Sequence, residues 1–243
     1  MRDTDNVPAP ATIESLGDSV AKLADEVYLS LTTIGTALST LWDRLTEKRR
    51  LALRATDLAL LRETILGELE RRGRLFNGAG VVMADSVLAD RPRHLEWWLP
   101  DAQRLNLELN PDSEYFYDYT KMEWFTVPRD QGRRWVQGPH LDYACTDEYV
   151  CTFSLPVTIT SGTFLGIAGA DVPVAAIEEV LLPRFQAFGQ RVVLVNSQGR
   201  VIIGTDPEFT TGSKTSRMDR SAATVPVESV PWSLRLLGST ASH

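Results

Sequence analysis

The chain has 243 residues, of which 43% are hydrophobic and 23% are charged, a composition typical of a globular protein that can bury a full core. Its formal net charge of −7 at pH 7 argues against a broad attraction to nucleic acid or to an anionic membrane surface. No apolar run approaches the roughly 18 residues that a membrane span requires, and the first twenty residues lack the apolar stretch of a secretory signal. We therefore expect a cytoplasmic protein without nucleic-acid or membrane partners, unless an upstream segment is missing.

Residues that could carry metal or redox chemistry are few. Cys145 and Cys151 are the only cysteines, and a reducing cytoplasm favours two free thiols over a disulfide. The histidines His94, His140 and His243 do not combine with them into zinc-like spacing. Glycine-rich phosphate loops and the GxSxG elbow of serine hydrolases are absent from the sequence. We expect no metal and no cofactor, and an enzyme is the less favoured class of protein.

The N-terminal part of the chain carries a helical pattern. Apolar residues recur every three or four positions from Ile13 to Leu45, which predicts one helix of more than thirty residues. Such a helix is longer than most globular domains need, and its near-heptad spacing favours pairing with a second copy of the chain. The alternative is a helix packed on its own domain. We expect residues 1–50 to be a dimerisation helix, with residues 12–46 forming a parallel homodimer.

The remaining elements predict the fold class. A second helical pattern begins after Thr56 or Asp57, either of which is a suitable N-cap, and ends at Gly73. Strands are expected within residues 80–88, 149–159, 163–172, 191–205 and 223–237, and a helix is expected over 174–185. Turn-forming residues in SGTFLG and NSQGRV indicate β-hairpins. This order predicts an α+β fold with an antiparallel sheet flanked by helices, rather than an alternating parallel fold.

Four short segments resemble the signature of the Cache family, sensor domains related to PAS domains. They are YDYTKMEWF (117–125), GPHLD (138–142), TFSLPV (152–157) and GTFLGIAGAD (162–171), and they occur in the order that the family has. The similarity extends from about residue 73 to residue 237. The resemblance implies a single PAS-like sensor domain over residues 51–243, behind a dimerising helix. Such a domain would bind a small ligand and signal to a downstream protein.

The resemblance also implies a pocket between the sheet and the aromatic segment. Family positions that contact the ligand are occupied here by Tyr117, Trp124, Asp142 and Asp171. In amino-acid-binding members an arginine clamps the ligand carboxylate and an aspartate receives its ammonium group. This chain departs from that pattern at three positions: Met122 replaces the arginine, His140 replaces a tyrosine and Glu123 replaces a proline.

The exchange of arginine for Met122 changes the expected ligand. Methionine offers no donors to a carboxylate, whereas the aspartates remain, so the site is biased toward cations. The faces of Tyr117, Trp124 and Tyr119 would add cation–π attraction, roughly 0.5–2 kcal/mol each when desolvated. We predict a small amine or organic cation as ligand. An amino acid is the alternative, with Lys121 as the positive charge, and an enzyme acting on a small amine is a further one.

Simpler structural roles are open for several of these residues. The aromatic segment could be a surface packed on the second helix, and Asp171 could cap the helix expected from Val174. His140 could be an ordinary turn residue. Trp97 and Trp98 are expected in the core rather than in a pocket wall.

Overall fold

The structure is a computed structural model that describes residues 12–47, 52–142, 148–215 and 221–238. The chain divides into two compact units, one of Ala24–Ala176 and one of Met1–Leu23 together with Ile177–His243. Each unit contains its own antiparallel sheet. The sequence predicted one sensor domain over residues 51–243, so this organisation differs from the expected one. Hydrophobic patterns locate strands, but they do not tell which strands share a sheet.

The unit Ala24–Ala176 is built on a five-stranded sheet. Its strands are β1 (Gly78–Met83), β2 (Leu95–Trp98), β3 (Trp135–Leu141), β4 (Tyr149–Thr158) and β5 (Phe164–Pro173). The order is β2-β1-β5-β4-β3, and all four pairings are antiparallel. β4 and β5 lie where the sequence predicted them. β2 and β3 were not predicted, because one is only four residues long and the other contains Gly138 and Pro139.

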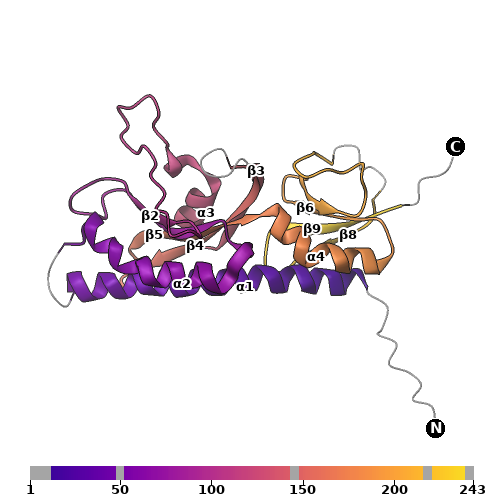
Figure 1. Cartoon of the computed structure of the whole chain (residues 1–243), viewed down its shortest axis with the longest axis horizontal. Helices are drawn as coiled ribbons and strands as arrows, with labels where there is room; N and C mark the ends of the chain where they lie inside the picture. The colour runs from indigo at the N-terminus through magenta and orange to yellow at the C-terminus, as the bar shows by residue number, and fades with distance from the viewer. Residues whose placement is uncertain (1–11, 48–51, 143–147, 216–220, 239–243) are drawn as a thin grey trace, which may run out of the picture. The chain divides into compact units, whose positions relative to one another are not determined.

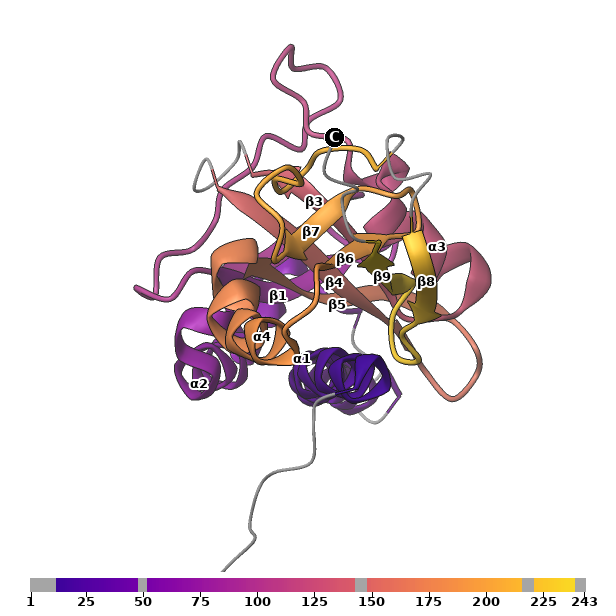
Figure 2. The ribbon, with the colours of Figure 1, turned by 90° about the vertical axis from the view of Figure 1, so that its right-hand side faces the viewer.

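Helices cover both faces of this sheet. They are α1 (Ile13–Trp42), continued by η1 (Asp43–Glu47), then η2 (Ala55–Leu61), α2 (Arg62–Arg72), η3 (Gly73–Leu75), η4 (Tyr119–Lys121) and α3 (Glu123–Gln131). Within this unit α1 and α2 lie side by side on one face, and α3 lies on the other (Figures 1 and 2). Tyr28 of α1 meets Phe153 of β4 edge-on, with ring centroids 5.4 Å apart. On the opposite face, Phe125 of α3 packs against Phe164 of β5.

The start of the second helical region differs in detail from the sequence-based expectation. The N-cap of η2 is Arg54, whose N–H donates to the Asp57 carboxylate at 2.9 Å. Asp57 therefore stabilises the first turn from its third position rather than as the cap itself. The helix ends at Gly73, as predicted. No helix within the described residues is both long and apolar enough to cross a membrane.

The apolar stripe of α1 is buried within the chain itself. Nine of the ten apolar residues of the stripe are buried, from Leu16 in α1 to Leu45 in η1, and Ile13 is half-buried. Side chains that are already buried in this way are not available to a second copy of the chain. The expected role of the stripe as a dimer seam is therefore corrected: it packs the helix on its own chain, while the dimer itself stays a prediction. The length of the helix reflects its participation in both units.

The second unit contains a four-stranded sheet. Its elements are the last part of α4 (Val174–Phe188), β6 (Val192–Asn196), β7 (Val201–Gly204), β8 (Ser221–Pro226) and β9 (Trp232–Leu237), with strand order β7-β6-β9-β8. Hairpins β6-β7 and β8-β9 coincide with predicted runs, as does α4. Val193, Val195 and Val201 form a small buried cluster against which Phe209 and Leu237 pack. The α+β class with antiparallel sheets is confirmed in both units.

Candidate ligand-binding site

A cavity of about 70 Å³ lies on the face of the five-stranded sheet that carries α3. It is lined by Val82, Leu95, Trp97, Leu105, Leu107, Tyr117, Tyr119, Trp124, His140, Asp142, Thr152 and Asp171. All five strands of the sheet contribute to its walls, and the segment 105–124 closes it from the other side. The cavity has room for roughly five to seven water-sized groups, so it suits a small ligand.

Trp97 forms one wall by lying over sheet positions that carry glycine. A Cβ on Gly78 would come within 2.5 Å of Nε1 of Trp97, and one on Gly169 within 3.1 Å of its ring. Real Cβ atoms essentially never approach to 2.5 Å, so the indole needs the glycine at 78, whereas a Cβ at 169 would require a small shift of the ring. Its N–H is buried and has no hydrogen-bond partner among the described residues. Trp97 therefore lines the cavity while its N–H stays buried without a described partner.

The aromatic wall is held by hydrogen bonds to the sheet. Tyr119 and Trp124 stack with their ring centroids 6.4 Å apart. The hydroxyl of Tyr119 donates to the carbonyl of Met83 at 2.8 Å, and the backbone N–H of Trp124 donates to Oε1 of Gln137 at 3.0 Å. Asp118 caps the short helix η4 by accepting from the backbone N–H of Thr120. The rings are thereby fixed before any ligand arrives.

Asp171 supplies a carboxylate from an inner strand of the sheet. It lies opposite Thr152 of β4, whose hydroxyl donates to Oδ1 of Asp171 at 2.6 Å. Burial raises the pKa of Asp171 to about 7, the hydrogen bond from Thr152 opposes the rise, and the charge of Asp142 adds to it. Asp171 lies within β5, and its side chain accepts a hydrogen bond from Thr152 of the neighbouring strand β4. It therefore does not act as the cap of α4.

Asp142 and His140 complete the polar part of the wall. Asp142 follows the end of β3, where its backbone N–H donates to the carbonyl of Glu148 at 2.9 Å. Burial lowers the pKa of His140, and the neighbouring charge of Asp142 opposes that change. Nδ1 of His140 is buried without a hydrogen-bond partner in the described part of the chain. At neutral pH the cavity therefore combines carboxyl groups with an uncharged imidazole.

The structure brings together most of the residues that the sequence singled out. Six of the eight line the cavity: Tyr117, Tyr119, Trp124, His140, Asp142 and Asp171. Met122 and Glu123 are not among the lining residues. They lie at the junction of η4 and α3, where Met122 is half-buried and Glu123 is exposed. Lys121 is 82% exposed and pairs with Asp118 at 3.0 Å. The lysine considered for a ligand carboxylate therefore lies outside the cavity.

Six lining residues were not predicted from the sequence. They are Val82, Leu95, Trp97, Leu105, Leu107 and Thr152. Trp97 was expected in the core and is buried there, and its place beneath the cavity depends on glycines far from it in the chain. The sequence pattern could have located part of the wall formed by the segment 105–124. There Leu105, Leu107 and Leu109 alternate with polar residues, which is typical of an extended segment.

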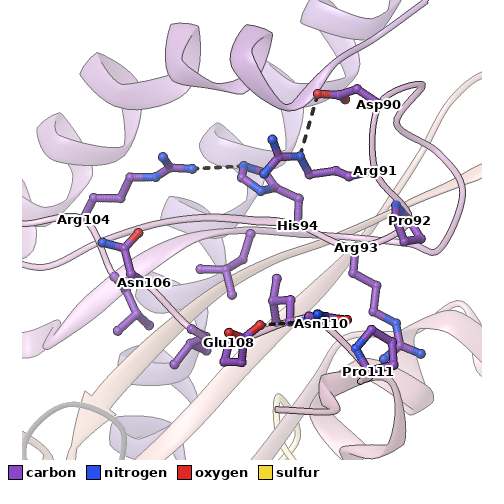
Figure 3. A pocket seen from close by; sticks show the side chains of 14 residues that line it. Asp90, Arg91, Pro92, Arg93, His94, Arg104, Asn106, Glu108, Asn110 and Pro111 are labelled. Carbon is purple, nitrogen blue, oxygen red and sulfur yellow. Dashed lines mark hydrogen bonds and ion pairs between the residues drawn. The ribbon is translucent and has the colours of Figure 1, made fainter. Parts of the chain in front are cut away.

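A larger groove of about 520 Å³ lies beside the cavity, between residues 90–95 and 104–111 (Figure 3). Three arginines line it, and each lies within 4 Å of a carboxylate: Arg91 of Asp90, Arg93 of Asp85 and Asp118, and Arg104 of Glu96. The guanidinium of Arg104 also lies 3.0 Å from Nε2 of His94. A dashed line marks this contact in Figure 3. Since these positive charges are already matched, the smaller cavity is the stronger candidate site.

Comparison with known proteins gives structural neighbours alone. No protein-family model and no curated protein matches the sequence. The ligand-binding domain of the amino-acid chemoreceptor PctC of Pseudomonas aeruginosa PAO1, solved with GABA, is 16% identical with a TM-score of 0.62, covering 93% of this chain and 96% of that one. The L-alanine-bound ligand-binding domain of the Pseudomonas fluorescens chemoreceptor CtaA is 12% identical with a TM-score of 0.63, covering 94% of each chain.

A third similar structure is the extracellular domain of a candidate histidine kinase, soHK1S-Z6. It is 16% identical with a TM-score of 0.55, covering 93% of this chain and 92% of that one. At such low identity, the likeness shows the fold alone. The chain therefore has the fold of these domains, which is the Cache-like, PAS-like fold that the resemblance implied.

Proposed function

We propose that this chain is a sensor domain that binds a small organic amine in the cavity beside Asp171. One observation carries the proposal: the cavity has two carboxyl groups and several aromatic faces, and none of its described lining residues is lysine or arginine. Asp171 receives the ammonium group of the ligand, while Tyr117 and Trp124 surround its carbon chain. The fold is consistent with this function, because similar structures are sensory ligand-binding domains.

Electrostatics favour an ammonium ligand over a ligand that also carries a carboxylate. A carboxylate placed in the cavity would meet the charge of Asp142 and, above about pH 7, that of Asp171, with no opposing cation among the described lining residues. Like charges at short range in a partly dry site disfavour each other by several kcal/mol, whereas an ammonium group is attracted to both. The aromatic rings add cation–π attraction of roughly 0.5–2 kcal/mol each.

An amino acid is the second candidate ligand. PctC and CtaA were solved with GABA and L-alanine. Nε1–H of Trp97 and Nδ1 of His140 are buried without partners among the described residues, so a small shift of either ring would let it serve a ligand carboxylate. These groups are neutral donors, weaker than an arginine fork. We therefore rank amino acids below amines.

The proposal extends to relay of the bound state to a downstream protein and to a homodimer. The dimer contact would use a surface other than the buried stripe of α1. Light scattering at micromolar concentration tests this part.

The expected cytoplasmic location stays a prediction, to be tested by locating the native protein in fractionated cells.

A thermal-shift screen of the full chain tests the proposal. Amines, quaternary ammonium compounds, polyamines and amino acids are compared, and a ligand at 100 times its Kd should stabilise the fold by about 2.7 kcal/mol. We expect the amines to give the largest shifts. Recovery of the bound amine unchanged after prolonged incubation distinguishes a sensor from an enzyme. Shifts with amino acids only would contradict the amine assignment.

A further inference from the structure

The amine cavity and the larger groove beside it share a wall. Three leucines line both spaces: Leu95, Leu105 and Leu107. A side chain that borders two spaces lies between them, so these leucines separate a cavity of about 70 Å³ from a groove of about 520 Å³. The length of ligand that the cavity accepts therefore depends on this partition.

Leu107 is the part of the partition that depends least on the sheet. Leu95 is in β2 and is 6% exposed, so it belongs to the core. The backbone N–H of Leu105 donates to the carbonyl of Trp97 at 2.9 Å, which ties Leu105 to the edge of the sheet. Leu107 follows two residues later, half-buried between two exposed neighbours. Its side chain can therefore be shortened with less disturbance of the sheet than either of the other two.

Hydrogen bonds hold the backbone on both sides of Leu107. The bond from Leu105 to Trp97 lies on one side, and on the other the backbone N–H of Tyr117 donates to the carbonyl of Glu108 at 2.8 Å. Between these two points the side chain of Leu107 packs against the buried cluster that includes Trp97. The partition is thereby in place before a ligand binds.

The volume of the cavity gives the length at which an amine would meet this partition. About 70 Å³ holds roughly five to seven water-sized groups, which corresponds to n-butylamine through n-hexylamine with the ammonium group at Asp171. Within that range each added methylene is removed from water and should tighten binding roughly fourfold. A longer chain must displace Leu107 or leave its end outside the cavity.

We propose that Leu107 limits the amine ligand to a short chain by separating the cavity from the groove. The inference rests on the proposed amine-binding function and adds a residue that determines its specificity. Shortening Leu107 to alanine opens a passage between the two spaces, through which a chain of eight carbons extends from Asp171 into the groove.

The ratio of two Kd values, for n-octylamine and n-butylamine, tests the inference by calorimetry on the full chain at pH 7.5. We expect the native chain to bind n-octylamine at least tenfold more weakly than n-butylamine, and Leu107→Ala to bind n-octylamine at least as tightly. A general loss of stability would weaken both amines alike and leave the ratio unchanged. Equal or tighter binding of n-octylamine by the native chain would overturn the length limit and leave the amine proposal standing. Binding of neither amine would overturn both.

Two further variants separate the partition from its surroundings. Leu109→Ala is the matched control, because Leu109 is also half-buried, packs against the same cluster and lines the groove but not the cavity. It should keep the native ratio. Leu107→Val removes less of the side chain and should give an intermediate ratio. A native ratio in Leu107→Ala, or an equal shift in Leu109→Ala, would refute the role of Leu107.

Discussion

The substitution Asp171→Asn tests the electrostatics of the cavity, because it removes the ionisable group and keeps an oxygen that can accept from Thr152. The pKa of Asp171 is about 7 in the folded chain, against an ordinary value of 3.8. The folded state therefore holds this proton more tightly than the unfolded state does. The resulting stability is fully present below about pH 4 and is lost as the pH rises through 7.

The size of the effect follows from the pKa difference. About three pKa units at 1.36 kcal/mol per unit give roughly 4 kcal/mol as an upper limit. Part of the side chain faces the cavity, where solvent screens the charge, so we expect about half of this limit, ~2 kcal/mol. Asparagine carries no charge at any pH. The variant should therefore gain ~2 kcal/mol relative to the native chain between pH 4.5 and pH 8.

Urea denaturation of the full chain at pH 4.5, 6 and 8 measures this difference. The free energy of unfolding of the native chain should fall relative to that of Asp171→Asn as the pH rises, and amine binding should be lost in the variant at every pH. The exposed-loop variant Asp112→Asn should follow the native profile. Parallel pH profiles for the native chain and Asp171→Asn would refute the raised pKa, and with it this view of the cavity.

Three further predictions concern packing and chemistry. Gly78→Ala should weaken amine binding at least tenfold by calorimetry, because its Cβ would displace Trp97; unchanged binding would remove Trp97 from the wall. Leu31→Asp should lower the free energy of unfolding by more than 3 kcal/mol, since Leu31 is fully buried; a stable, folded monomer would instead restore the pairing role of the stripe. In a Cys145→Ser background, Cys151 should react with a thiol reagent in denaturant only, because it is a buried free thiol whose pKa burial raises; fast labelling of the native chain would contradict its burial.

Local patterns predicted most elements and part of the site. β4, β5 and the hairpin β6-β7 follow from β-branched runs with turn residues between them. Asp171 and Trp124 could be singled out because they belong to sequence motifs.

Cys145 lies outside the described residues, so the expectation of two free thiols is supported here for Cys151 alone.

What the sequence did not predict depends on contacts between distant segments. The stripe of α1 has the same spacing whether it faces a second copy or its own sheet, so only the folded chain distinguishes the two. Trp97 reaches the cavity because Gly78 and Gly169 leave room for it on neighbouring strands. Met122 and Lys121 differ from Trp124 in direction at the start of α3, and motif spacing alone does not tell which of them faces the cavity.

The most direct test of the amine-binding claim compares n-butylamine with L-2-aminopentanoate by calorimetry at pH 7.5. These ligands share one carbon skeleton apart from the α-carboxylate, so the ratio of their Kd values isolates the response of the cavity to that group. Because the described lining residues include two carboxyl groups and no lysine or arginine, we expect n-butylamine to bind at least tenfold more tightly. Tighter binding of L-2-aminopentanoate would contradict the account and favour an amino-acid sensor.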